Sequence, residues 1–249
     1  MNESTPLLRW LAALAIVAAT GAAAAPGPYA LTELGEAPGD LPNSARGFAI
    51  NNQGVVAGAY RIGEGRGTRP FVSIDGVLYS LGVPLHRVRS GTRGINDHGQ
   101  VVGETTEGRS NGRAFLWQRG HYTDLGTLAN TWAAAKAIDS AGTVVGWSGM
   151  EDLGGHAFVY QGGVMQDIHP FGHYSQATAI SPNGLVAGNW WNDLEALAGF
   201  VYRDGQAADP DPLHSPIWVN GVNDAGQVVG MGLALDGTGA PTRRCGRTA

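Results

Sequence analysis

Apolar and polar positions along the chain repeat with a period of 42 to 45 residues. In each copy an apolar residue precedes Asn, Asp or Ser, and a glycine follows three places later. Apolar, mostly β-branched residues then lead to a second glycine. The copies are INNQGVVAG (Ile50 to Gly58), INDHGQVVG (Ile95 to Gly103), IDSAGTVVG (Ile138 to Gly146), ISPNGLVAG (Ile180 to Gly188) and VNDAGQVVG (Val222 to Gly230). Asn and Asp hydrogen-bond to their own backbone, and glycine accepts positive φ without a Cβ clash. Each copy therefore predicts a tight β-hairpin with positive φ at its central glycine.

The second half of each period carries a phenylalanine and then a short turn. The four phenylalanines are Phe71, Phe115, Phe158 and Phe200. The strand after the turn ends in Leu-Gly or a variant of it, as in YTDLG (Tyr122 to Gly126). In the first unit we expect strands at 46–51 and 55–60, followed by a polar loop at 61–68. Four short strands per period are typical of a propeller blade, and the phenylalanines should be buried between neighbouring sheets.

Other repeat architectures fit this pattern less well. Leucine-rich and hexapeptide solenoids have shorter periods, and helical repeats need a 3.6-residue periodicity that is absent here. A two-sheet sandwich accommodates the same strands but does not explain the near-constant period. The sequence therefore predicts an all-β fold: a β-propeller-like repeat of about five four-stranded blades, the last incomplete, in a single domain spanning 26–240.

The two ends of the repeat region carry separate expectations. Tyr29 to Gly35 (YALTELG) reads as a lone strand that closes the ring by pairing with the sheet containing Val228 and Val229. The last missing strand should fall near Arg243, but the chain there reads PTRRCGRTA and has no phenylalanine. We therefore treat 241–249 as an atypical, poorly ordered tail. A degenerate strand, a truncated repeat protein and a frame-shifted end all remain open.

Residues 1–24 have the pattern of an export signal. Arg9 precedes an apolar run from Trp10 to Thr20, and small residues lead to a cleavage site after Ala24. The alternative is a short membrane anchor, but the apolar run is shorter than the roughly 20 residues that a helical span requires. We expect an exported protein, whether periplasmic, extracellular or at the cell surface, with no stable membrane span.

Composition narrows the classes of partner. The net charge is −5, only 15% of residues are charged, and Lys136 is the single lysine, so no basic surface for nucleic acid is expected. The single cysteine, Cys245, excludes an internal disulfide. Hydrolase and phosphate-binding motifs such as G-x-S-x-G and H-E-x-x-H are absent. We accordingly assign no catalytic residue and no cofactor, and expect a monomer.

The tripeptide His156-Ala157-Phe158, the DLG strand at Asp124 to Gly126 and the IN-x-x-GQVVG hairpin together resemble the HAF family of bacterial extracellular repeat proteins. Three further segments match the tripeptide with departures: Arg113-Ala114-Phe115, Arg69-Pro70-Phe71 and Ala198-Gly199-Phe200. The resemblance covers Tyr29 to about Gly232. It implies an exported β-repeat protein and carries over no catalytic residue.

The long loops, which alternation places on one face, supply the candidate ligand site. Aromatic side chains bind sugars by stacking on the ring faces, and neighbouring carboxylates hydrogen-bond to the sugar hydroxyls. The candidate residues are Trp147, Glu151, Trp190, Trp191 and Asp193. The alternative interpretation is that these tryptophans only cover strand ends.

Two metal hypotheses are weaker. The histidines of the long loops are His86, His169, His173 and His214; converging imidazoles would bind zinc or copper, but local hydrogen bonding explains them better. The Asn/Asp turns, such as Asn96-Asp97, lack the alternating oxygen ligands of a calcium loop, so we ascribe them to turn formation. No metal site is therefore predicted.

Our leading hypothesis is an exported, non-catalytic binding module for an unidentified ligand or protein partner, with a glycan as one candidate. The first alternative is a glycan-processing enzyme on the long-loop face, using Glu151, Asp152, Asp193 or Glu195. The second is a non-functional truncated repeat protein.

Overall fold

The computed structural model describes residues 33–35, 44–62, 67–83, 89–107, 111–151, 154–191, 197–209, 217–235 and 241–248. These residues form strands, turns and irregular segments, with no helix. Accordingly, the described part of the chain contains no helix with the length and apolarity of a membrane span. Glu33–Ala249 forms one compact unit, and the structure below is that of this unit. The predicted export signal lies outside the described residues.

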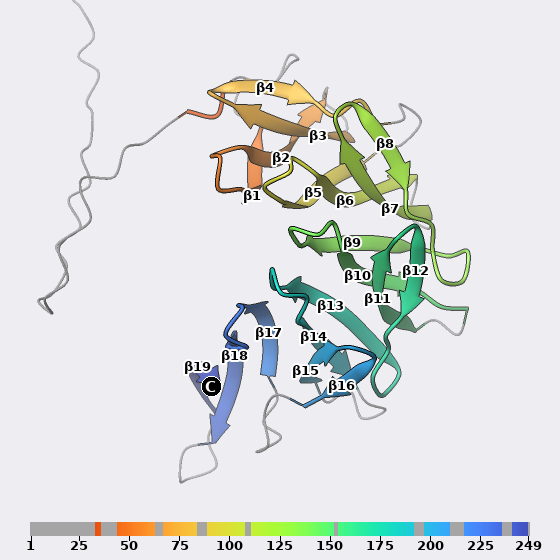
Figure 1. Ribbon diagram of the computed structural model, residues 1–249, viewed down its shortest axis with the longest axis vertical. Coiled ribbons are helices and arrows are strands. Elements are labelled where there is room, and N and C mark those ends of the chain that lie inside the picture. Colours follow the sequence, from red (N-terminus) through yellow and green to blue (C-terminus); the bar gives the residue numbers. More distant parts are fainter. Residues whose placement is uncertain are drawn as a thin grey trace, which may run out of the picture. The chain divides into compact units, whose positions relative to one another are not determined.

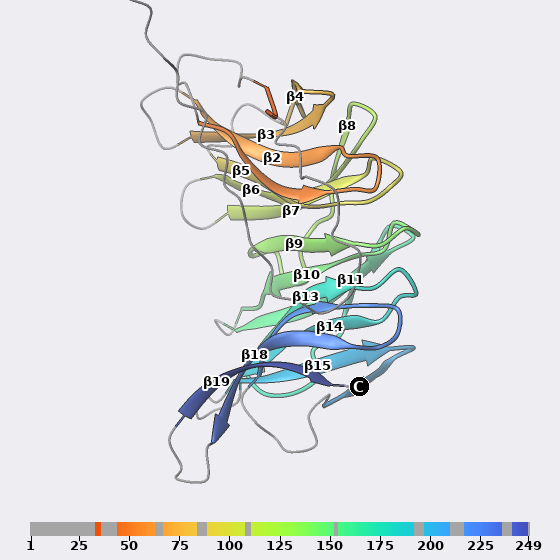
Figure 2. The same ribbon diagram turned by 90° about the vertical axis from the view of Figure 1, so that its left-hand side faces the viewer.

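Nineteen strands form five consecutive groups within the described residues (Figures 1 and 2). The first two groups are β1 (Arg46–Ile50), β2 (Val56–Ile62), β3 (Gly67–Ile74) and β4 (Val77–Ser80), then β5 (Arg89–Ile95), β6 (Val101–Glu107), β7 (Asn111–Gln118) and β8 (His121–Asp124). The next two are β9 (Ala133–Ile138), β10 (Val144–Gly149), β11 (Gly155–Gln161) and β12 (Val164–Asp167), then β13 (Tyr174–Ile180), β14 (Val186–Trp191), β15 (Leu197–Arg203) and β16 (Gln206–Ala208). The last is β17 (Ile217–Val222), β18 (Val228–Leu235) and β19 (Pro241–Thr248).

Each group is an antiparallel sheet in which neighbours along the chain are paired. The third and fourth groups are joined into one eight-stranded sheet by a parallel pairing of Gly155 with Tyr174. The successive sheets lie side by side in chain order in both views (Figures 1 and 2). The predicted all-β, propeller-like fold is confirmed: four blades have four strands, and the last has three in its described part.

The predicted hairpins are confirmed at the turns. All five central glycines have positive φ: Gly54 at 79°, Gly99 at 71°, Gly142 at 85°, Gly184 at 82° and Gly226 at 74°. The polar residue that opens each turn closes it by accepting backbone hydrogen bonds. Asn51 Oδ1, for example, accepts from the amides of Gln53 at 3.1 Å and Val55 at 2.9 Å. Turn formation therefore explains the Asn and Asp residues, as predicted.

The same turns also tie neighbouring sheets together. Asn51 Nδ2 donates to the carbonyl oxygen of Asn96, and Asn96 Nδ2 donates to that of Asp139. Asp97 accepts from the backbone amide of Asn52 at 2.9 Å and from its side chain at 2.7 Å. In the first two hairpins, therefore, the asparagine that closes the turn also hydrogen-bonds to the turn of the next sheet.

The core lies between successive sheets. The four repeat phenylalanines are fully buried, as predicted. Phe158 on β11 packs with Val102 and Ala114 of the preceding sheet, and Phe200 on β15 packs with Val145 and Ala157. The interfaces between the second and third and between the third and fourth sheets are therefore filled by small aliphatic residues of one sheet and a phenylalanine ring of the next.

The Leu-Gly ends of the fourth strands contribute to this core. Leu125, which follows β8, is buried and donates its amide to the carbonyl oxygen of Ala114 at 2.9 Å. Ile168 makes the equivalent bond to Ala157. The aspartates before them, Asp124 and Asp167, each accept a backbone amide two residues ahead, so their role here is structural.

Three expectations about segments need correction. The atypical tail is not irregular: Pro241–Thr248 is β19, paired with β18 along its whole length, so backbone pairing persists without a phenylalanine. The 61–68 loop is shorter than expected, because β2 and β3 continue pairing to Ile62 and Gly67. The described end of the proposed closing strand, residues 33–35, is not in a strand, and Tyr29 to Thr32 lie outside the described residues.

Candidate functional site

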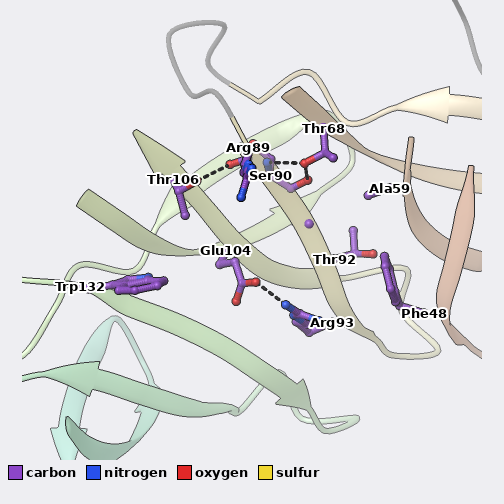
Figure 3. Close-up of a pocket in the computed structure, with 11 residues that line it drawn as sticks. Phe48, Ala59, Thr68, Arg89, Ser90, Thr92, Arg93, Glu104, Thr106 and Trp132 are labelled. Carbon is purple, nitrogen blue, oxygen red and sulfur yellow. Dashed lines mark hydrogen bonds and ion pairs between the residues drawn. The ribbon is translucent and has the colours of Figure 1, made fainter. Parts of the chain in front are cut away.

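A cavity of about 600 Å³ opens beside the first strands of the first three sheets (Figure 3). Phe48 on β1, Arg89 to Arg93 on β5, Glu104 and Thr106 on β6, and Trp132 before β9 line it, together with Ala59 and Thr68. We call this the polar cavity. It combines two arginines, one carboxylate, several hydroxyls and two aromatic rings.

An ion pair on neighbouring strands defines one wall. The Arg93 guanidinium donates to Glu104 Oε1 at 2.5 Å and lies 5.9 Å from the centre of the Phe48 ring (Figure 3). The Glu104 side chain is 17% exposed and that of Arg93 is 40% exposed. The carboxylate is thus fixed by its partner and still reaches the cavity.

Lys136 on β9 adds a second cation beside this pair. Desolvation lowers the pKa of Lys136; the nearby Arg93 lowers it further, and Glu104 acts in the opposite direction. A partly buried ammonium group is poorly solvated, so its charged form needs a neighbouring anion.

Two buried hydroxyls that line the polar cavity have no hydrogen-bond partner in the protein. Ser90 is 2% exposed and Thr92 is fully buried, and neither Ser90 Oγ nor Thr92 Oγ1 is bonded. Leaving a buried hydroxyl unsatisfied costs about 1 to 3 kcal/mol. Both oxygens are closed to solvent, so a bound molecule would reach them only after a local rearrangement of the cavity wall.

The unpaired Ser90 hydroxyl has an identifiable cause in the sequence. Ser175 occupies the same place in the fourth repeat, five residues before the hairpin isoleucine, and accepts the amide of Ala157 at 2.9 Å. The residue equivalent to Ala157 in the first repeat is Pro70, which has no amide hydrogen to donate. The RPF variant of the repeated tripeptide thus frees a hydroxyl at the polar cavity.

Trp132 is positioned by a glycine and by two hydrogen bonds. A side chain at Gly112 on β7 would occupy the space of the Trp132 indole, so glycine leaves room for the ring. The Trp132 carbonyl oxygen accepts the Gly149 amide at 2.6 Å and the Ser148 hydroxyl at 3.1 Å. Its indole Nε1 is buried and unpaired.

Trp132 also begins a row of five aromatic rings across three sheets. Neighbouring centroids in the row are 5.3, 5.8, 4.8 and 5.6 Å apart. The members of this aromatic row are Trp132, Trp147, Tyr174, Trp191 and Trp218, all partly buried. Tyr174, Trp191 and Trp218 together with Gln176 line an open cavity of about 580 Å³. Desolvation raises the pKa of Tyr174 to about 12, which keeps its hydroxyl neutral at physiological pH.

The structure brings together only some of the predicted site residues. Trp147 and Trp191 are both in the aromatic row, where Tyr174 connects them. Trp190 packs against Phe171 and the core around Phe200 instead, because adjacent residues of β14 point to opposite sides. Glu151 is exposed in the turn after β10. Asp193, like Asp152 and Glu195, lies outside the described residues.

The structure places only some of the candidate metal-binding histidines. Both ring nitrogens of His169 are engaged, Nδ1 with the Ser175 hydroxyl at 2.7 Å and Nε2 with the Gly172 carbonyl oxygen at 2.9 Å. Its ring stacks on that of His156, 3.9 Å away, and His156 Nδ1 contacts Asp167 at 2.7 Å. His86 and His214 lie outside the described residues. Within the described ranges, no group of three or more His, Cys, Asp or Glu side chains is placed to hold a metal ion.

Sequence reasoning missed Trp132, Tyr174 and the whole polar cavity. A signal existed for the first two, since each stands six residues before its hairpin isoleucine. No comparable signal marked Arg93 and Glu104, which are 11 residues apart and meet through the register of β5 and β6.

No protein-family model matches the chain, and no curated protein matches it. Among solved structures of similar fold is TolB from Acinetobacter baumannii, with TM-score 0.52 and 9% identity. The match covers 82% of this chain and 55% of TolB, so this chain spans little more than half of that protein. A gluconolactonase from Xanthomonas campestris has TM-score 0.46 and 13% identity, covering 81% and 75% of the two chains. An aldose sugar dehydrogenase from Streptomyces coelicolor, in its PQQ-bound form, has TM-score 0.43 and 12% identity, covering 86% and 84%.

These comparisons correct the leading functional hypothesis. The expectation of a non-catalytic binding module rested on the repeat fold and the absence of catalytic motifs. Structures described as enzymes are among the propellers that this chain resembles in fold. The absence of the searched catalytic motifs gives no ground for excluding catalysis.

Proposed function

We propose that the protein is a hydrolase acting on a sugar ester or lactone, with the saccharide lying along the aromatic row and its reacting group in the polar cavity. The observation that carries this proposal is the position of Trp132, which belongs to both. Aromatic faces stack on sugar rings, and hydroxyl and guanidinium groups bond to sugar oxygens.

The carboxylate content of the cavity favours acyl transfer over glycoside cleavage. Glycosidases generally need two carboxyl groups flanking the bond, whereas Glu104 is the only carboxylate among the described residues that line the polar cavity. Hydrolysis of an ester requires one general base and donors for the developing oxyanion.

In this mechanism Glu104 takes a proton from a water molecule as the water oxygen attacks the acyl carbon. The negative charge that develops on the carbonyl oxygen is stabilised by the Arg93 guanidinium, whose side chain is 40% exposed. Collapse of the intermediate breaks the acyl–oxygen bond, and the departing alkoxide takes the proton held by Glu104. Acid and alcohol are the products, and the carboxylate is restored.

The test of catalysis is hydrolysis of O-acetylated xylo-oligosaccharides and of an aldonolactone, followed in a pH-stat. We expect the wild-type protein to turn over at least one class and Glu104→Gln to lower kcat by about 100-fold or more, the usual range for a general base. Glu107→Gln, a change at an exposed carboxylate on the same strand, should leave kcat unchanged. A Glu104→Gln variant of full activity, or a folded wild type inert toward both classes, would refute the proposal.

The aromatic row has its own matched pair of variants. Trp191→Ala should raise KM for oligosaccharides about 5- to 150-fold, corresponding to about 1 to 3 kcal/mol for a lost aromatic anchor. Trp190→Phe changes the adjacent ring that faces the core, and should leave KM unchanged. Equal effects of the two substitutions would mean that the row does not contact the saccharide.

The proposal includes export from the cytoplasm. It is supported by the sequence of residues 1–24, whose charged start, apolar run and small residues are typical of a signal peptide.

A further inference from the structure

Each interface between successive sheets has two matching halves. The earlier sheet contributes the apolar residue before the second glycine of its hairpin, and that residue is fully buried in every case. The later sheet contributes the apolar residue that opens its own hairpin. The two residues share a hydrophobic cluster at all four interfaces: Ala57 with Ile95, Val102 with Ile138, Val145 with Ile180, and Ala187 with Val222. A sheet therefore needs a neighbour on each side to cover both residues.

The last sheet carries the first half of this interface without the second. Val229 on β18 precedes the second glycine of the fifth hairpin and is 50% exposed, whereas its four equivalents are fully buried. Met231, two residues further along the same strand, points to the same side and is also 50% exposed. We call Val229 and Met231 the trailing face.

The first sheet carries the other half. Ile50 opens the first hairpin and is 67% exposed. Val56, which pairs with Ile50 across β1 and β2, is only half-buried, although its four equivalents in the later repeats are buried. Leu34 packs on this sheet as well but leaves Ile50 open. We call Ile50 and Val56 the leading face.

The hydrogen bonds of the turns stop at the last sheet in the same way. Asn96 Nδ2 donates both to Gln100 Oε1 at 2.6 Å and to the carbonyl oxygen of Asp139 in the next turn at 2.9 Å. Asn223 Nδ2 repeats the first of these bonds, to Gln227 Oε1 at 2.9 Å. No later hairpin follows it in the part of the chain that the structure describes, so the second donor hydrogen has no next turn to reach.

Exposed apolar ends are unusual for a repeat protein, because terminal repeats generally have a polar outer face that keeps the array soluble. Here the two ends are complementary, since each presents the half-interface that the other lacks. A second copy of the same chain therefore supplies a counterpart for each face, in the arrangement that already joins successive sheets within one copy.

We propose that copies of this chain associate head to tail, with the trailing face of one copy packed on the leading face of another. Asn223 Nδ2 then donates to the Asn51 carbonyl oxygen of the second copy, as Asn96 does to Asp139 within one chain. The contact is heterologous, so it generates a closed ring of copies or a filament. Composition, from which we expected a monomer, carries no trace of these faces.

Sedimentation velocity of the purified protein over a wide range of concentrations tests the association. The average mass should rise with concentration, and Val229→Glu and Ile50→Glu should each weaken the association by at least about tenfold, because a carboxylate would be buried without a partner. Both positions are exposed in the single chain, so both variants should unfold in dilute solution at the wild-type midpoint. Val164→Glu, at a 66% exposed valine on β12, is the matched control and should associate as the wild type does.

A mixing experiment tests the head-to-tail geometry. The Val229→Glu copy keeps an intact leading face, and the Ile50→Glu copy keeps an intact trailing face. An equimolar mixture of the two variants should therefore form a mixed dimer, although each variant alone stays monomeric at the same concentration. A mixture that remains monomeric overturns the proposed geometry.

Other outcomes also overturn the inference. A wild type that is monomeric at every concentration does so, whether the two faces are then covered by residues 26–32 of the same chain or stay open. Loss of association in Val229→Glu but not in Ile50→Glu would mean that trailing faces pair with each other. An equal loss in Val164→Glu would mean that added charge, and not these faces, controls the association.

Discussion

The two glycines of each hairpin are required for different physical reasons. Gly184 has a φ of 82° and open space where a Cβ would lie, so only backbone strain opposes a side chain there. Gly188 faces the carbonyl oxygen of Gln176 and the ring of Phe200, where a Cβ would collide. The first glycine shapes the turn, and the second lets two strands and a ring come together.

Alanine at these two positions should therefore give different losses of stability. Gly184→Ala should lower the free energy of unfolding by about 1 kcal/mol, the cost of a left-handed conformation. Gly188→Ala should cost about 3 kcal/mol or more, because backbone and ring must both move. Urea unfolding of the two variants measures the difference, and equal losses would contradict the distinction.

At the scale of elements, the phenylalanine of the third strand holds one sheet to the preceding one. Phe158→Ala should lower the free energy of unfolding by roughly 3 to 5 kcal/mol, since it leaves a cavity among Val102, Ala114 and Leu125. Phe171→Ala is the control, because that ring is 46% exposed and should cost less than about 1 kcal/mol. Thermal and urea unfolding of both variants provide the measurement, and a Phe158→Ala loss no larger than the control would contradict this packing role.

The hydrogen bonds between neighbouring turns give a prediction about pH. Donation from the Asn52 amide and side chain lowers the pKa of Asp97 below its ordinary value of 3.8. The pKa of Asp97 is therefore lower in the folded protein than in the unfolded chain. The stabilisation that these hydrogen bonds give the folded state is present above pH 3.8 and is lost as the pH falls through the pKa of the folded protein.

We expect an NMR titration of the Asp97 carboxyl group to have its midpoint below 3.8. Asn52→Ala should move this midpoint upward, because one of the two donors is removed. A wild-type midpoint at or above 3.8 would show that the turns do not hold the carboxylate.

At the scale of the whole molecule, residues before the first sheet contribute to its core. Leu34 packs on the cluster of Tyr60, Phe71 and Leu78, and its carbonyl oxygen accepts the Ser73 hydroxyl at 2.6 Å. Deletion of residues 26–36 should therefore lower the unfolding midpoint, and Leu34→Ala alone should cost about 1 to 2 kcal/mol for a partly buried leucine. Exposed Glu33 supplies the control, since Glu33→Ala should change the midpoint little. A deletion variant as stable as the full chain would show that this contact contributes nothing.

The repeat fold was predictable because its turns and buried positions are determined by residues close together in the sequence. Asn51, Gly54 and Phe71 each specify a turn or a buried position by their own chemistry, and the period repeats the turn five times and the phenylalanine four times. The polar cavity was not predictable because it depends on departures from the repeat: Pro70 in place of Ala157, and Arg93 at a position where the other copies have Phe, Lys, Thr or Asn. β19 was missed for a related reason, since antiparallel pairing with β18 uses the backbone and leaves no required residue type in the sequence.

The aromatic row gives the protein an intrinsic optical reporter. Rings with centroids 4.8 to 5.8 Å apart have coupled electronic transitions, which split and intensify the near-ultraviolet circular dichroism of the tryptophans. A molecule that stacks on Trp191 or rotates its indole changes this coupling along the row. Occupancy of the surface is therefore readable from the protein's own spectrum, without a label and without knowledge of the occupant.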